Sequence, residues 1–248
     1  DMLAKKIGGN VAIDEIAIAP ANFLILQAMA AISRPRCEIL LPDPGFPTYR
    51  LAAEFLDLEI QCYDTIRKHL GLEGNDNKGL PKHYSPDAIV ISNPNNPLGH
   101  GAPWRHYQDL IGEAERTGSW IIFDETYINL CYDESMGLPI EADRERCIRI
   151  FSVSKEHAVP GLRTGYCLAP RDIVETINRF TSLTVSCFPS FVQLAVADYL
   201  ESDLSRRFVK ELRESMKERF VYLEECFEAK GLGSSLVVQP NAGFYAMI

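Results

Sequence analysis

One segment of the chain, Phe151–Tyr166, combines residue types that could form a covalent bond to an aldehyde and hold a phosphate beside it. Lys155 stands three residues after Ser152 and eight residues before Arg163. A lysine amine condenses with an aldehyde, and arginine and serine side chains bind phosphate oxygens. Pyridoxal 5′-phosphate (PLP) carries both groups, so the spacing suits a PLP site. Taken alone, the segment would read as an ordinary surface loop, because serine, lysine and arginine are common on surfaces.

A second segment, IIFDETYINL, places Asp124 at the end of an expected strand and Tyr127 three residues later. Catalytic groups in open α/β sheets lie at the carboxyl ends of strands. A carboxylate in that place could pair with a pyridinium nitrogen and keep it protonated. Asp124 could also be a simple helix cap, which is a common role for aspartate.

Three further segments contain candidate binding residues. The turn in IVISNPNNPLG holds Asn96, whose amide could bind a ligand oxygen, and DPGFPTY holds Phe46, whose ring could stack on a planar ligand. A core position is the more common role for any single phenylalanine. IAIAPANFLILQAM predicts a strand, a tight turn and a helix, whose first N–H groups at Ala21 and Asn22 could bind a phosphate. Neither GxGxxG nor GxxxxGK[ST] occurs in the chain, which argues against a nucleotide-binding loop.

The elements that must position these residues follow an alternating pattern. Apolar runs with β-branched residues alternate with amphipathic stretches, which predicts an α/β sheet buried on both faces. The expected strands are Ile16–Ala19, Cys37–Leu41, Glu59–Tyr63, Ala88–Ser92, Ser119–Asp124, Cys147–Ser152 and Gly165–Ala169. The expected helices are Phe23–Ala31, Tyr49–Phe55, Trp104–Arg116, Arg171–Leu183 and Phe191–Leu200, and Leu70–Ser85 is expected to be a long loop.

The pattern changes after Leu200. A long charged helix is expected over Leu204–Lys230, and Leu236–Gln239 and Gly243–Ile248 predict strands of a second domain. We therefore predict a three-layer αβα sandwich with a mostly parallel sheet over residues 1–200. Residues 201–248 are predicted to form part of a smaller α+β domain.

Composition excludes several classes of partner. The chain has 248 residues and a net charge of −9, so we expect no nucleic-acid or anionic membrane partner. The apolar run Phe23–Ile32 is too short to span a bilayer. Seven scattered cysteines without CxxC predict reduced core thiols in a cytoplasmic protein. The five histidines show no metal-ligand spacing, so we expect no metal.

The ordered set DPGFPTY, SNPNNPLG, FDETY and SVSKEHAVPGLRTGY resembles the class I/II aminotransferases, which are fold-type I PLP enzymes. The resemblance runs from about Ile16 to Tyr245, nearly the whole chain. It implies that Lys155 would form a Schiff base with PLP and that Asp124 would bind the pyridine nitrogen. It also implies that Tyr127 would hydrogen-bond the ring O3′ oxygen.

The resemblance implies binding roles for the remaining candidates. Asn96 would hydrogen-bond O3′ with Tyr127, and Phe46 would stack on the ring. The phosphate would be bound by Ser152, Arg163, Ala21 and Asn22. In this family the phosphate loop usually has glycine followed by a small or hydroxyl residue. Here Pro20 removes one N–H donor and Asn22 replaces Ser or Thr.

The activity that the resemblance implies is transfer of an amino group between an amino acid, or a similar amine, and a keto acid. Lys155 would be the general base that moves the substrate proton. The family also implies a homodimer. We further expect that the arginine for the substrate carboxylate and an N-terminal arm lie outside these 248 residues.

Two alternatives remain. The VPGLR stretch after Lys155 also resembles aminocyclopropane-carboxylate synthases, so a PLP-dependent lyase or synthase is one. Both reactions begin from the same carbanion, and the cofactor residues do not separate them. A non-catalytic aminotransferase-like protein is the other, favoured by the altered phosphate loop and opposed by intact Lys155, Asp124, Tyr127 and Arg163.

Overall fold

The structure, a computed structural model, describes residues 11–72, 85–132 and 144–248. These residues form a seven-stranded sheet of order β1-β7-β6-β5-β4-β2-β3. Pairing is parallel from β6 across to β3, while β7 is antiparallel to both β6 and β1. The strands are β1 (Ile16–Ile18), β2 (Glu38–Asp43), β3 (Glu59–Asp64), β4 (Ala88–Ser92), β5 (Trp120–Asp124), β6 (Cys147–Phe151) and β7 (Tyr166–Leu168).

The helices lie in the segments that the amphipathic pattern predicted, with two short additions, Thr65–Leu70 and Val153–Glu156. They are α2 (Ala21–Ile32), α3 (Pro47–Phe55), α4 (Thr65–Leu70), α5 (Gln108–Thr117), α6 (Val153–Glu156), α7 (Arg171–Thr184), α8 (Ser190–Glu201) and α9 (Asp203–Ala229). The helix expected from Trp104 begins as the 3₁₀ turn η2 (Trp104–Tyr107) and continues as α5. Within the described ranges, no helix combines the length and the apolar character needed to cross a bilayer.

One added helix, α4, directly precedes the expected loop Leu70–Ser85 and overlaps it only at Leu70. The Asp64 side chain accepts a hydrogen bond of 3.0 Å from the Arg67 N–H, and Gly71 ends the helix at φ +63°. An aspartate cap at one end and a left-handed glycine at the other stabilise even this short helix. Most of the expected loop, residues 73–84, lies outside the described residues.

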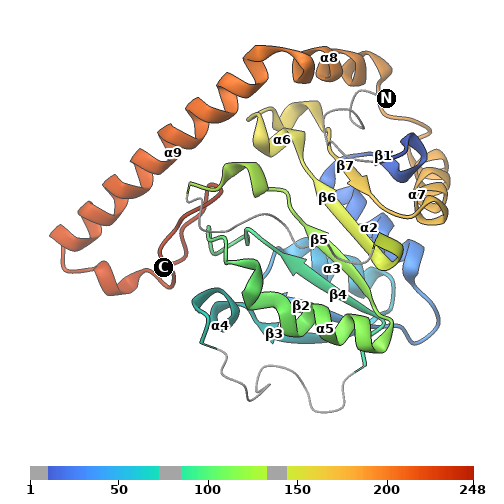
Figure 1. The fold of residues 1–248 in the computed structure, drawn as a ribbon, viewed down its shortest axis with the longest axis horizontal. Coiled ribbons are helices and arrows are strands. Elements are labelled where there is room, and N and C mark those ends of the chain that lie inside the picture. Colours follow the sequence, from blue (N-terminus) through green and yellow to red (C-terminus); the bar gives the residue numbers. More distant parts are fainter. Residues whose placement is uncertain (1–10, 73–84, 133–143) are drawn as a thin grey trace.

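Two apolar cores, one on each face of the sheet, make the three layers (Figure 1). Val90, Ile122 and Ile150 face the core that α2, α3 and α7 cover. Their strand neighbours Ile89 and Phe123 face the other core, which α5 and η2 cover. Successive strand residues therefore point to opposite faces, and both faces are buried. The predicted fold class, a mostly parallel α/β sheet between helices, is confirmed.

The segment after α9 departs from the prediction. Leu236–Gln239 and Gly243–Ile248 are not strands. The Val237 N–H donates to the Met247 carbonyl at 3.0 Å, and Ala242 forms an isolated bridge with Cys131. A strand needs a continuous ladder of such bonds, which an apolar pattern alone does not supply. The segment instead returns from α9 toward the ends of β4 and β5 (Figure 1). The division at residue 200 stays a prediction.

Candidate functional site

A cavity of about 260 Å³ lies at the carboxyl ends of the central strands, beside the start of α2. Every residue that the sequence predicted for the site lines this cavity. They are Ala21, Asn22, Phe46, Asn96, Asp124, Tyr127, Ser152, Lys155 and Arg163. The structure thus brings together side chains from five separate segments, as expected for parallel strands whose carboxyl ends meet at one edge. The individual roles of these residues stay predictions.

The Asp124 carboxylate is buried at the end of β5 and is held from two sides. Its Oδ1 accepts a hydrogen bond of 3.0 Å from the Thr126 N–H, and its Oδ2 accepts one of 2.5 Å from the Tyr49 hydroxyl. Burial raises the pKa of Tyr49 well above its usual range, and the negative charge of Asp124 raises it further. Tyr49 therefore stays protonated and acts as a permanent donor that fixes the carboxylate.

Sequence reasoning missed Tyr49. It follows Phe46 in DPGFPTY, and the apolar pattern predicts it only as the start of the next helix. The available signal was a tyrosine beside a predicted site aromatic, because a buried tyrosine hydroxyl usually finds a partner. Phe46 packs against Tyr49 edge to face, with ring centroids 5.8 Å apart.

Tyr127 and Asn96 share the cavity wall. The Tyr127 hydroxyl lies 3.2 Å from the Tyr245 hydroxyl. Burial raises the pKa of Tyr127 far above its usual range, Tyr245 adds to this, and the Asn96 side chain opposes it. Tyr127 is therefore a hydroxyl donor and not a phenolate at neutral pH.

The start of α2 and Arg163 form a positively polarised end of the cavity. Arg163 donates from Nη2 to Asn22 Oδ1 at 2.9 Å. The first N–H groups of α2, at Ala21 and Asn22, have no carbonyl within the helix to bond, so they can serve an anion. Gly165 allows the start of α2 and the end of β6 to lie close together at this end of the cavity. A Cβ at this position would lie 2.6 Å from the Phe151 carbonyl oxygen and 3.1 Å from the Ala21 nitrogen.

Lys155 lies on the one-turn helix α6, directly after β6 and the buried Ser152. Within the described residues its amine forms no hydrogen bond or ion pair, so it is available to a ligand. The cavity thus combines a primary amine, a fixed carboxylate, an aromatic ring and an anion-binding end. This donor set fits the aldehyde, the pyridine nitrogen, the ring and the phosphate of PLP.

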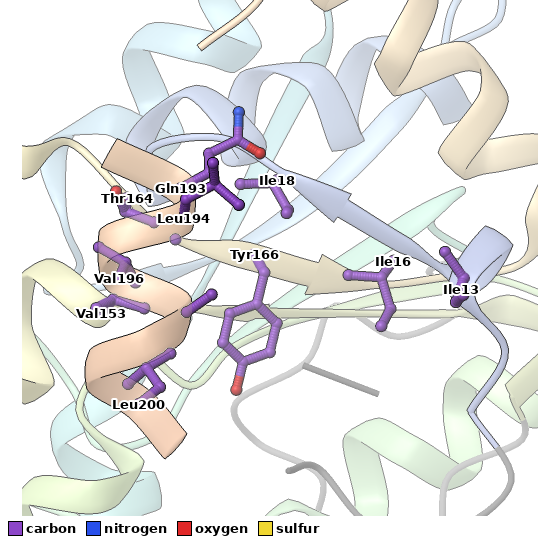
Figure 2. Close-up of a pocket in the computed structure, with 12 residues that line it drawn as sticks. Ile13, Ile16, Ile18, Val153, Thr164, Tyr166, Gln193, Leu194, Val196 and Leu200 are labelled. Carbon is purple, nitrogen blue, oxygen red and sulfur yellow. The ribbon is translucent and has the colours of Figure 1, made fainter. Parts of the chain in front are cut away.

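A second cavity, of about 250 Å³, lies between β1, β7 and α8 (Figure 2). Its walls are mainly aliphatic, with Ile16, Ile18 and Leu194 among them. Of the described residues that line it, none is charged, and the polar ones are Thr164, Tyr166 and Gln193. Such walls supply neither an acid–base pair nor a phosphate site, so the chemistry belongs to the first cavity.

Comparison with known proteins agrees with this geometry. Residues 19–248 match the family model for aminotransferase class I and II. The chain is 27% identical over 241 residues to an aspartate aminotransferase of Thermococcus kodakarensis, covering 96% of this chain and 61% of that protein. It is 30% identical over 215 residues to nicotianamine aminotransferase 1 of Oryza sativa subsp. japonica, covering 82% of this chain and 43% of that protein.

The fold has close neighbours among solved structures. A double mutant of Thermus thermophilus aspartate aminotransferase superimposes with a TM-score of 0.87 at 23% identity, covering 99% of this chain and 65% of that one. This chain therefore spans less than two thirds of the length of these relatives. The family match over nearly all of its residues nevertheless identifies it: the chain belongs to the class I/II aminotransferases, which are fold-type I PLP-dependent enzymes.

Proposed function

We propose that the protein is a PLP-dependent aminotransferase that moves an amino group between an amino acid, or a similar amine, and a keto acid. The observation that carries this proposal is the convergence of Lys155, Asp124 and Arg163 on one cavity. Family membership supports it, as do relatives that are themselves named aminotransferases.

The bound cofactor would supply an electron sink for a carbanion beside the substrate nitrogen. In the proposal, the Lys155 amine attaches the cofactor and, once freed, accepts the substrate Cα proton as general base. The Asp124 carboxylate holds a proton at the pyridine nitrogen, and Tyr49 and Thr126 keep that carboxylate in place. Such a preorganised charge stabilises a transition state without having to move.

The other residues would bind and orient. The Tyr127 hydroxyl and the Asn96 amide donate to an oxygen on the ring, and Phe46 covers the ring. Arg163, Ser152 and the first N–H groups of α2 hold the phosphate. The Arg163–Asn22 hydrogen bond supports this, because it keeps the guanidinium beside the helix start.

Borohydride reduction followed by peptide mass spectrometry tests the proposal. We expect the pyridoxyl group on Lys155 of the intact protein and none in a Lys155→Ala control. A label on a different lysine, or no label in a preparation that holds PLP, would overturn the attachment site. An amine-donor screen then separates the activities, because transfer builds up the pyridoxamine form of the cofactor during turnover and a lyase or synthase does not.

The proposal includes a homodimer in the cytoplasm. The corner between α7 and α8 leaves Leu183, Phe191 and Leu194 exposed by 88%, 75% and 64%. Phe23 of α2 packs edge to face on Phe188 in the same corner, so this surface adjoins the phosphate end of the cavity. An exposed apolar corner of this kind favours burial against a second subunit. The seven cysteines are thiols, which agrees with a reducing compartment.

A further inference from the structure

The segment Asn241–Tyr245 is hydrogen-bonded to the turn that carries Asn96. The backbone N–H groups of Asn241 and Ala242 both donate to the Gly99 carbonyl at 3.0 Å. The Asn241 side chain accepts from the Gly101 N–H at 2.6 Å and donates to the Gly101 carbonyl at 3.0 Å. Two backbone and two side-chain hydrogen bonds leave this segment little freedom, so the position of Tyr245 is fixed relative to this turn.

The same segment is also fastened to the loop that carries Tyr127. The Gly243 N–H donates to the Leu130 carbonyl at 3.0 Å, and the Tyr132 N–H donates to the Asn241 carbonyl at 2.8 Å. The Tyr132 hydroxyl bonds to the Gly243 carbonyl. Residues 241–245 therefore bridge two loops that both line the cavity.

Tyr127 is enclosed by this bridge. The rings of Phe244 and Tyr245 meet the Tyr127 ring edge to face, with centroids 5.9 Å and 5.8 Å away. A Cβ on Gly243 would come within 3.4 Å of the Tyr127 Cδ1 atom. The Tyr127 and Tyr245 hydroxyls lie 3.2 Å apart. The ring is thus packed on several sides, and among the described residues its hydroxyl interacts with both Tyr245 and the Asn96 side chain.

We propose that Tyr245 is a positioning residue, which acts on the cofactor only through the hydroxyl of Tyr127. The inference rests on the proposed function for the role of Tyr127. In this structure the Tyr127 hydroxyl donates to the Tyr245 oxygen at 3.2 Å. Tyrosine hydroxyls rotate, so when Tyr127 turns its proton into the cavity the pair reverses and Tyr245 donates to the Tyr127 oxygen. A hydroxyl that accepts a hydrogen bond is itself a stronger donor. Tyr245 thereby strengthens the hydrogen bond that Tyr127 gives to the ring oxygen of PLP.

A double-mutant cycle on the cofactor-free intact protein tests the pair itself. We expect Tyr127→Phe and Tyr245→Phe each to lower the melting temperature by about 2 to 4 °C, since each removes one side of the same hydrogen bond. The melting temperature of the double variant should be no lower than that of the less stable single variant, because either single substitution already removes the hydrogen bond between the two hydroxyls. Additive shifts would overturn the pairing. This result does not depend on cofactor binding.

The pH dependence of the bound-cofactor absorbance tests the action through Tyr127. A hydrogen bond to the ring oxygen stabilises the anionic form of that oxygen. Tyr127→Phe should therefore move the midpoint of the absorbance titration to higher pH. Tyr245→Phe should move it the same way by a smaller amount. It should have no effect in the Tyr127→Phe background.

Tyr132→Phe is the matched control, because its hydroxyl fastens the same segment at Gly243 without being the partner of Tyr127. It should leave the midpoint in place. A wild-type midpoint in Tyr245→Phe, or a shift that persists without the Tyr127 hydroxyl, would overturn the inference. Failure of the intact wild-type protein to bind PLP would instead overturn the proposed function, and the unfolding cycle would still decide the pairing.

Discussion

The Asp124 carboxylate depends on a residue 75 positions away in the sequence. Tyr49, on α3, donates to Oδ2, while the nearby Thr126 N–H holds Oδ1. Replacement of Asp124 by alanine would therefore have two effects. It would remove the carboxylate charge, and it would leave the buried Tyr49 hydroxyl without its acceptor. The second effect alone costs about 1 to 3 kcal/mol of stability.

Asp124→Asn separates the charge from the packing. The amide oxygen can accept from the Thr126 N–H while the amide nitrogen donates to the Tyr49 hydroxyl, which can also act as an acceptor, so we expect a melting temperature close to that of the wild type. Turnover should fall by about 10²- to 10³-fold, because the charge beside the pyridine nitrogen is lost. Steady-state kinetics and thermal unfolding measure the two effects. Near-normal turnover in this variant would leave Asp124 with only a structural role.

Tyr49→Phe tests whether the fixed orientation of the carboxylate matters. We expect turnover to fall about tenfold, which corresponds to one lost hydrogen bond to a charged group. Tyr63→Phe is the control, because Tyr63 is equally buried and its hydroxyl donates to the Val90 carbonyl at 3.0 Å in the other core. It should lose stability and keep its turnover. Equal losses of turnover in both variants would contradict a specific role for Tyr49.

At the scale of elements, Gly99 controls how closely the C-terminal segment approaches the Asn96 turn. It adopts φ +64°, and a Cβ there would lie 1.7 Å from the Tyr245 carbonyl oxygen. Gly118, at the end of α5, has a similar φ of +69° with no atom within 4 Å of an added Cβ. Both glycines therefore adopt a left-handed backbone conformation, but only Gly99 lacks room for a side chain.

Alanine at each position therefore separates strain from overlap. Gly118→Ala should cost about 1 to 2 kcal/mol from the left-handed backbone alone. Gly99→Ala should cost more than about 3 kcal/mol, because the segment must move as well. It should also weaken PLP binding, since both loops beside the cavity shift. Equal costs in denaturant unfolding would show that the close contact carries no energy.

A buried ion pair joins β5 to β6 beside the site. Arg149 donates from Nε and Nη2 to Glu125 at 2.6 Å and 2.7 Å, and the Glu125 side chain is 1% exposed. Burial raises the pKa of Glu125, and Arg149 opposes that rise. Without Arg149, the pKa of this carboxyl would rise further, because burial would act alone.

Arg149→Met should therefore destabilise the protein in a pH-dependent way. A native carboxyl with a raised pKa binds its proton more tightly than the unfolded chain does. The contribution of this carboxyl to stability is then complete below its pKa in the unfolded chain, about 4.3. That contribution is lost as the pH rises through the pKa of the same carboxyl in the folded protein. We expect a loss of about 3 kcal/mol at pH 8 and a smaller one at pH 5.

Arg116→Met supplies the comparison for this pair. Arg116 makes the same two-pronged contact with Glu113 on the surface of α5. Water screens an exposed pair, so its loss should change stability little at either pH. If Arg149→Met were equally destabilised at pH 5 and pH 8, the cost would come from lost packing and not from the buried charge.

At the scale of the whole molecule, the proposed dimer makes the apolar corner between α7 and α8 an interface. Leu183→Asp should convert dimer to monomer at micromolar concentration by light scattering, because a charge in a buried interface is strongly unfavourable. Leu204→Asp is the control, since Leu204 is 64% exposed at the start of α9 and lies outside this corner. A wild-type protein that is monomeric while holding PLP would contradict the dimer.

The sequence by itself determined the sheet and most of the helices, and it predicted the residues that line the site cavity. Strands and helices follow from local apolar periodicity, and Lys155, Asp124 and Arg163 stand in segments whose residue types match their predicted chemistry. Helix α4 was not predicted, because its segment lacks strong apolar periodicity. Its only signals are the Asp64 cap and the glycine that ends it, Gly71. The predicted domain division at residue 200 also came from local pattern alone.

Only the tertiary structure decided which partners hold these residues in place. Tyr49 reaches Asp124 across 75 positions, and Tyr245 reaches Tyr127 across 118. No local pattern records such contacts, because they depend on where distant segments meet after folding. The final segment shows the same limit: its apolar residues resemble a strand, yet its hydrogen bonds go to the loops beside the cavity. A strand requires a pairing partner, and the amino-acid pattern of one segment does not specify where that partner lies.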